Sequence, residues 1–110
     1  MLTETRLVLG QALPGGSVLA VLYTVPAATQ AVVSTIMVCN ESNQPTTYSL
    51  SIAVAGAADA LAQYIAYQAP LLANESKGYT IGITLGPADV IRCLSASGQV
   101  AFSAFGVQIA

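Results

Sequence analysis

Short runs of apolar and β-branched residues, separated by turn residues, dominate this sequence. The clearest run covers residues 46–55, where apolar residues alternate with small ones. One side of the pattern carries Tyr48, Leu50, Ile52 and Val54, and the other carries Thr47, Ser49, Ser51 and Ala53. A period of two is the pattern of a β-strand that buries one face. The small residues on the second side suit a sheet that lies against a neighbour or one that faces solvent weakly, and the period alone does not choose between these.

Eight runs of this kind predict eight strands. They cover residues 6–13, 18–25, 32–39, 46–55, 64–71, 77–85, 90–95 and 100–109. Gly, Pro, Asn and Ser clusters separate them, and short strands at such regular spacing are typical of antiparallel sandwiches. The sequence therefore predicts an all-β fold, with 1–110 as one antiparallel β-sandwich or jelly roll of about eight strands.

Two segments lie outside this pattern. Residues 56–63 are predicted to form a long loop, and the alternative is one helical turn at 58–63 with Asp59 near its positive end. Ahead of the first run, residues 1–5 are expected to form an N-terminal arm.

Charge is scarce in this chain. It has 110 residues, of which 55% are hydrophobic and 7% charged, with no His and a net charge of -2. A typical soluble domain is about 25% charged. Scaling with mass gives a folded surface of about 5,700 Å², and so few charges on it favour association. We therefore expect a homo-oligomer, with a trimer favoured; the alternative is a monomer coated with Ser, Thr, Ala and Gly.

The same scarcity argues against an enzyme. General acid–base catalysis needs titratable groups brought together, and the five acids fall in predicted loops or strand ends. They are Glu4, Glu41, Asp59, Glu75 and Asp89. We assign no catalytic, cofactor-binding or metal-binding residues, and we expect no cofactor.

Cys39 and Cys93 lie in separate apolar runs. No secretion signal is visible, so two buried free thiols are favoured, and a disulfide between them is the alternative. Neither has a nearby His or Cys with which to build a zinc site.

Nucleic acid and membrane partners are not expected. Arg6, Lys77 and Arg92 are far apart in sequence, whereas nucleic-acid binding needs clustered cations. Residues 17–39 are long enough to span a bilayer, but Pro26 interrupts them. The N-terminus lacks the basic start and apolar run of a signal peptide, which predicts a chain that stays in the cytoplasm where it is made.

Three further motifs have an ordinary structural interpretation. Asn40-Glu41-Ser42 and Asn74-Glu75-Ser76 match the glycosylation pattern, but we interpret them as turns with local side-chain bonds. The five tyrosines could form a sugar-stacking platform, but core packing is favoured, with Tyr64 and Tyr67 expected on opposite faces of a strand. Gly78, Gly82, Gly86 and Gly106 predict bulges or close backbone contacts rather than a phosphate loop.

Several short strings, in this order and spacing, resemble small β-rich structural proteins of tailed bacteriophage virions. They are LYTVPA at 22–27, AVVS at 31–34, VCN at 38–40, ANE at 73–75, IGITL at 81–85, DVIR at 89–92 and FSAFG at 102–106. The resemblance covers residues 19–109, most of the chain. It implies either a capsid decoration (cement) protein or a component of tail fibres or tail tips, and it brings no catalytic or metal-binding residues.

The resemblance thus implies a non-enzymatic protein of the virion, made in the host bacterial cytoplasm. As a decoration protein it would stabilise the phage head by binding between capsomers, with the major capsid protein or other virion proteins as partners. The alternative is a tail fibre, tail tip or baseplate module whose loop 56–63 and exposed tyrosines contact a host surface.

Overall fold

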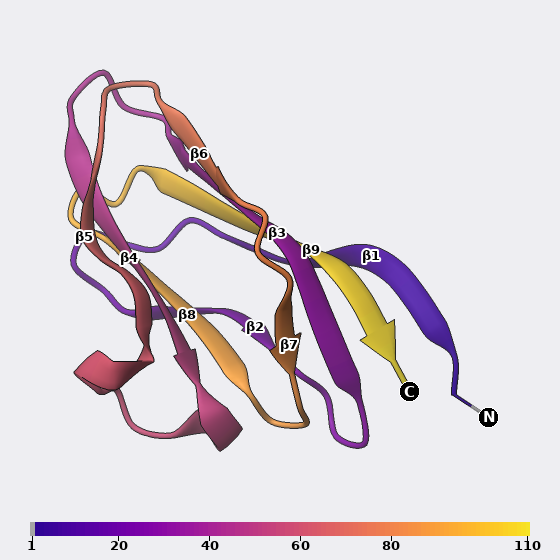
Figure 1. Ribbon diagram of the computed structural model, residues 1–110. Coiled ribbons are helices and arrows are strands. Elements are labelled where there is room, and N and C mark those ends of the chain that lie inside the picture. Colours follow the sequence, from indigo (N-terminus) through magenta and orange to yellow (C-terminus); the bar gives the residue numbers. More distant parts are fainter. Residues whose placement is uncertain (1) are drawn as a thin grey trace.

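The computed structural model, which describes residues 2–110, consists of two antiparallel β-sheets packed face to face (Figure 1). Sheet A has the order β1-β9-β3, with β6 and β7 both paired to the far side of β3, and sheet B has the order β2-β8-β4-β5. The strands are β1 (Glu4–Ala12), β2 (Ala20–Thr24), β3 (Gln30–Asn40), β4 (Thr46–Ala53), β5 (Tyr64–Leu71), β6 (Ser76–Tyr79), β7 (Ile83–Leu85), β8 (Val90–Ser95) and β9 (Val100–Ile109). The predicted all-β sandwich is confirmed.

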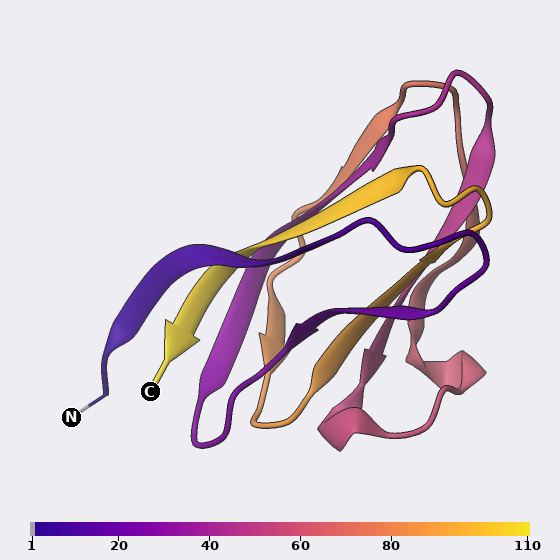
Figure 2. The same ribbon diagram turned by 180° about the vertical axis from the view of Figure 1, so that it is seen from behind.

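The strand pairing is nested from the ends of the chain inwards. β1 pairs with β9, β2 with β8, β3 with β6 and β7, and β4 with β5. The chain therefore folds as one long antiparallel hairpin that is divided between two sheets. When β6 and β7 are counted as one strand, this is the strand order of a jelly roll. The view from behind shows β1 and β9 side by side, with both termini at one end of the molecule (Figure 2).

Nine strands are present rather than eight because residues 77–85, predicted as one strand, are divided. Gly82 adopts a φ of 65°, a left-handed conformation that ends the pleat between β6 and β7. Unbroken alternation over 77–85 would place Ile81 on the same side as Tyr79 and the buried Leu85, but Ile81 is 59% exposed. The two pieces pair with β3 on either side of the bulge at Val33/Thr35, so the division follows a bend in β3.

The core lies between the sheets, and its largest fully buried side chains are Tyr48 of β4 and Phe102 of β9. Their rings meet edge to face with centroids 6.3 Å apart, which joins sheet B to sheet A. The Tyr48 hydroxyl also hydrogen-bonds the Tyr79 hydroxyl of β6. Burial, and then this bond, raise the pKa of Tyr48 well above its ordinary range. The accessible surface of 5719 Å² agrees with the value expected from the mass.

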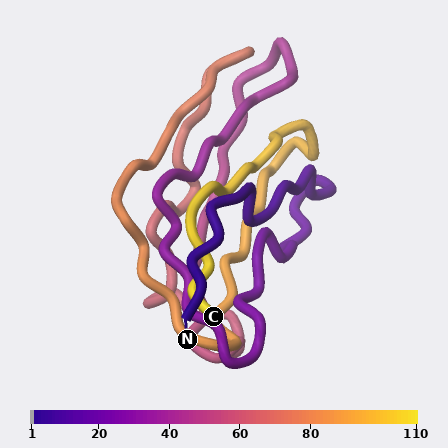
Figure 3. Tube along the Cα trace, turned by 90° about the vertical axis from the view of Figure 1, so that its right-hand side faces the viewer, coloured from indigo at the N-terminus to yellow at the C-terminus, as the bar shows by residue number. Residues whose placement is uncertain are grey.

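The segment between β4 and β5 and the chain termini differ in detail from the sequence expectations. β4 stops at Ala53, so Val54 is exposed, and two short 3-10 turns (Val54–Gly56 and Leu61–Gln63) replace the alternative single turn at 58–63. The loop interpretation of 56–63 otherwise holds. Of the arm expected at 1–5, residue 1 lies outside the described residues. The rest extends sheet A, because the Thr3 and Ala110 backbones exchange two hydrogen bonds. The two ends run side by side in a third view (Figure 3).

Candidate interaction surfaces

The outer face of sheet A has no covering layer within the described residues (Figures 1 and 2). Residues that alternate with the buried core positions make up this face. They are Glu4, Arg6, Val8 and Gln11 of β1, Ala101, Ser103, Phe105, Val107 and Ile109 of β9, and Gln30, Val32, Ser34, Met37 and Cys39 of β3. Only Glu4 and Arg6 in this set are charged, and both lie on the edge strand β1.

The middle of this face is hollowed. A shallow depression of about 600 Å³ is lined by Arg6, Leu7, Val8, Ser34, Phe105, Gly106 and Val107. The strand register places Arg6, Val107 and Val32 in one row across three strands, so the floor is mostly aliphatic and aromatic. A charge-poor apolar surface of this kind is typical of a protein–protein contact.

The outer face of sheet B is different, because the chain's own segment 54–63 is bonded to it. The Tyr64 hydroxyl donates to Asp59 at 2.8 Å, and the Arg92 guanidinium donates to the Gly56 carbonyl at 3.3 Å. Ser49 and Ser51 belong to this outer side of β4, yet both are buried. The small residues of β4, for which the pattern left a neighbour and weak solvent exposure open, are therefore buried within the single chain.

Tyr64 and Tyr67 do not lie on opposite faces as predicted. Their rings meet edge to face, with centroids 5.1 Å apart at 83°. The prediction fails because β5 has two register shifts against β4, one between Tyr48 and Leu50 and one between Leu50 and Ser51, which break the alternation. Desolvation, and then the bond to Asp59, raise the pKa of Tyr64. Tyr67 remains 55% exposed.

Three of the carboxylates, on Asp59, Glu75 and Asp89, serve local structure instead of converging on a site. Asp89 accepts backbone N–H bonds from Ala55 at 2.8 Å and Gly86 at 2.9 Å, which ties two loops together. Glu75 accepts the Leu72 N–H at 2.8 Å within its own turn. Across residues 2–110, no three Cys, Asp or Glu side chains gather where they could hold a metal.

The two Asn-Glu-Ser motifs form adjacent turns, which confirms the interpretation as local hydrogen-bonding residues. The Asn40 side chain is 1% exposed, and its amide nitrogen donates to the carbonyls of Gln44 and Leu72. Its oxygen accepts the Ser42 N–H. The Asn74 N–H donates to the Ser42 carbonyl at 2.9 Å, so the second turn rests directly on the first.

The two cysteines lie in different sheets, and both are free thiols in this structure. Cys93 is fully buried on β8, where burial raises the pKa of its thiol to about 12. Cys39 is partly exposed on the outer face of sheet A. Among the glycines, Gly106 is a close backbone contact, because a Cβ there would lie 2.0 Å from the Val32 carbonyl oxygen.

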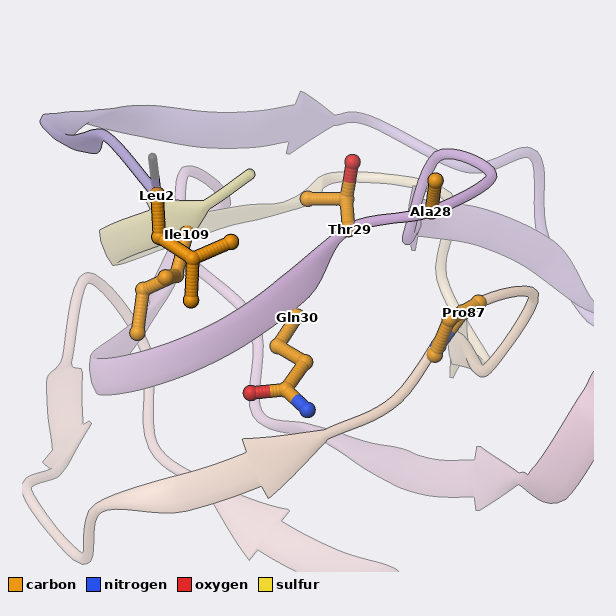
Figure 4. Close-up of a pocket in the computed structure, with 6 residues that line it drawn as sticks. All are labelled: Leu2, Ala28, Thr29, Gln30, Pro87 and Ile109. Carbon is orange, nitrogen blue, oxygen red and sulfur yellow. The ribbon is translucent and has the colours of Figure 1, made fainter.

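A smaller pocket of about 170 Å³ lies near the two termini (Figure 4). Its lining comprises Leu2, Ala28, Thr29, Gln30, Pro87 and Ile109. None of these side chains is titratable, and the Thr29 hydroxyl already donates to the Ala27 carbonyl. The pocket therefore offers no acid–base chemistry. None of the helical segments within residues 2–110 is long and apolar enough to cross a membrane.

Comparison with known proteins identifies the fold. No protein-family model matches the sequence, and no curated protein matches it. Among solved structures, a chain in the structure of infectious bursal disease virus, Gx strain, matches with a TM-score of 0.55 and 13% identity over 99% of this chain. A chain in the Gt strain structure matches with a TM-score of 0.46 and 8% identity, covering 99% of this chain and 28% of that one. Our chain spans 32% of the Gx strain chain, and the likeness shows the fold.

Proposed function

We propose that this chain is a non-enzymatic structural protein of a virus particle. The bare outer face of sheet A is the observation that carries the proposal, because a domain with so few charges leaves this apolar surface uncovered. The likeness in fold to a chain of a virus structure supports the same class of function. Jelly rolls also occur in lectins and cupins, so the proposal depends on the outer face of sheet A and not on the fold alone.

Within this class, the function we favour is capsid decoration in a tailed phage. The protein would lie on the head between capsomers, with the outer face of sheet A packed on the major capsid protein or other virion proteins. Contacts in permanent assemblies are large and apolar. A protein that binds only the assembled lattice stabilises that lattice by mass action.

The test is made on purified particles. Mass spectrometry first shows whether the chain is a particle component and in what copy number. The protein is then stripped from the heads, and their heat and osmotic stability are measured with and without the protein added back. Weaker heads that recover on re-addition are expected, and unchanged stability would contradict the decoration role.

The alternative is a tail fibre, tail tip or baseplate module that contacts a host surface. The start of β5, which follows segment 54–63, favours this alternative, because the exposed Tyr67 ring lies against the Tyr64 ring there, with Arg92 near Tyr64. Aromatic rings with a nearby donor suit sugar recognition. Copy number separates the two roles, since a head protein is present in hundreds of copies and a tail protein in far fewer.

A further inference from the structure

The first half of β1 is an open sheet edge. β1 is the outermost strand of sheet A, and every residue from Glu4 to Val8 is exposed. Beyond Val8 a bulge turns the strand, and Gly10 approaches β2 so closely that a Cβ would lie 2.1 Å from the Leu22 carbonyl oxygen. The open edge is therefore confined to the segment before the bulge.

The hydrogen bonds of β1 show which backbone groups are free at this edge. Thr3 and Ala110 exchange both of their bonds, so Thr3 directs its N–H and C=O towards β9. In an antiparallel ladder the direction alternates. Glu4, Arg6 and Val8 consequently direct their N–H and C=O groups away from the molecule, where they form a template for another strand.

The charged residues Glu4 and Arg6 determine which strand can pair with this template and in which register. If a second copy of β1 lies antiparallel to the first, only even-numbered residues can exchange hydrogen bonds. One register places Glu4 opposite Arg6 of the second copy, twice by symmetry, with Thr5 on the two-fold axis. A shift of two residues either way places Glu4 opposite Glu4, or Arg6 opposite Arg6, and like charges directly opposite are destabilising.

We propose that two copies of this chain join along β1 in the Glu4–Arg6 register, which makes sheet A continuous across a two-fold axis. The contact is isologous, with the same patch on both copies. It brings the two outer faces of sheet A into one surface, and it places Glu4 and Arg6 of that face in mutual pairs. The inference does not depend on the virion role, and it yields a dimer rather than the trimer expected from the sequence.

The test is sedimentation equilibrium of the whole chain and of three variants over a concentration series. The wild type is expected to associate to a dimer. Glu4→Arg places two arginines opposite each other at both symmetric positions, and it should weaken dimerisation by about 10- to 30-fold. The double variant Glu4→Arg/Arg6→Glu restores opposite charges in the same register and should recover the wild-type dissociation constant.

Glu41→Arg is the matched control, because it makes the same charge change in the exposed loop after β3, at the other end of the molecule (Figure 1). It should leave dimerisation unchanged. Circular dichroism and thermal melting of each variant show whether the fold is kept. A chain that stays single at every concentration would overturn the proposal. So would a trimer, an equal loss in both single variants, or a double variant that does not recover.

Discussion

The two outer faces of this sandwich are built from similar residues, but only sheet B has a segment of the chain bonded to its outer face. On sheet B, segment 54–63 is bonded to the sheet through the Tyr64–Asp59 and Arg92–Gly56 hydrogen bonds. On sheet A, no segment among the described residues lies over the outer face (Figures 1 and 2). Both faces are poor in charge, so low charge alone does not mark a contact surface. We therefore infer the contact surface from low charge together with the lack of a segment of the chain bonded to that face.

This difference is the reason why we place the proposed contact with another chain on sheet A. Sheet B buries small residues such as Ser49 and Ser51 within the monomer, although Val21 and Tyr67 on the same sheet remain exposed. Sheet A has no such bonded segment among the described residues, and in our proposal another chain covers its outer face. Substitutions on the inner face and on the two outer faces test this comparison.

The largest effect is expected from a matched pair of phenylalanines on β9. Phe102 is fully buried against Tyr48, so Phe102→Ala should lower the free energy of unfolding by about 3–5 kcal/mol. Phe105 lies three residues later on the open face, and Phe105→Ala should cost the isolated chain about 1 kcal/mol or less. Urea denaturation measures both, and equal losses would show that the two faces are not distinct.

A second test uses the buried thiol of β8. Because burial raises the pKa of Cys93 to about 12 from an ordinary 9.0, the folded state holds the proton that the unfolded state releases. Its contribution to stability is complete below pH 9.0 and is lost as pH rises towards 12. At pH ~11 the wild type should lose about 2–3 kcal/mol more than Cys93→Ala does, relative to neutral pH. Denaturation at the two pH values measures these losses of stability, and equal losses in both proteins would show that the Cys93 thiol is not their cause.

The smallest effect is expected where segment 54–63 meets sheet B. Tyr64→Phe removes the exposed hydroxyl bond to Asp59 and should cost less than about 1 kcal/mol of global stability. The protection of the segment's backbone amides against hydrogen exchange should fall instead, because this bond helps to hold the segment in place. Hydrogen exchange of the amides at 57–63 is the measurement. Unchanged exchange there would mean that other contacts hold segment 54–63 in place, such as the Arg92 bond to Gly56.

Much of the fold follows from the sequence because strand periodicity is a local signal. The alternation at Tyr48, Leu50 and Ile52 correctly assigns the inner face of β4, and the turn clusters fall between the strands. The misassigned positions depend on contacts between distant segments. Ile81 follows the bend of β3, and the Tyr64–Tyr67 contact follows the bulges of β5 against β4.

The proposed contact surface is harder to predict from the sequence than the strands are. Low charge predicts that some face is covered, but it does not say which one, because sheet B carries small residues as well. That distinction depends on where segment 54–63 folds back, and its Ala-rich sequence has no periodic pattern. The open edge of β1 likewise needs the nested pairing, which places the first strand beside the last.

The most direct test introduces one charge into each outer face. Val107 on sheet A and Val21 on sheet B each lie opposite an arginine, Arg6 and Arg92 respectively. Val107→Glu and Val21→Glu therefore place a carboxylate in matched surroundings, and both should keep the fold. The measurement is the amount of each variant incorporated into purified particles relative to wild type. We expect Val107→Glu to be lost from particles and Val21→Glu to be retained; equal incorporation, or loss of Val21→Glu alone, would contradict the outer face of sheet A as the contact surface.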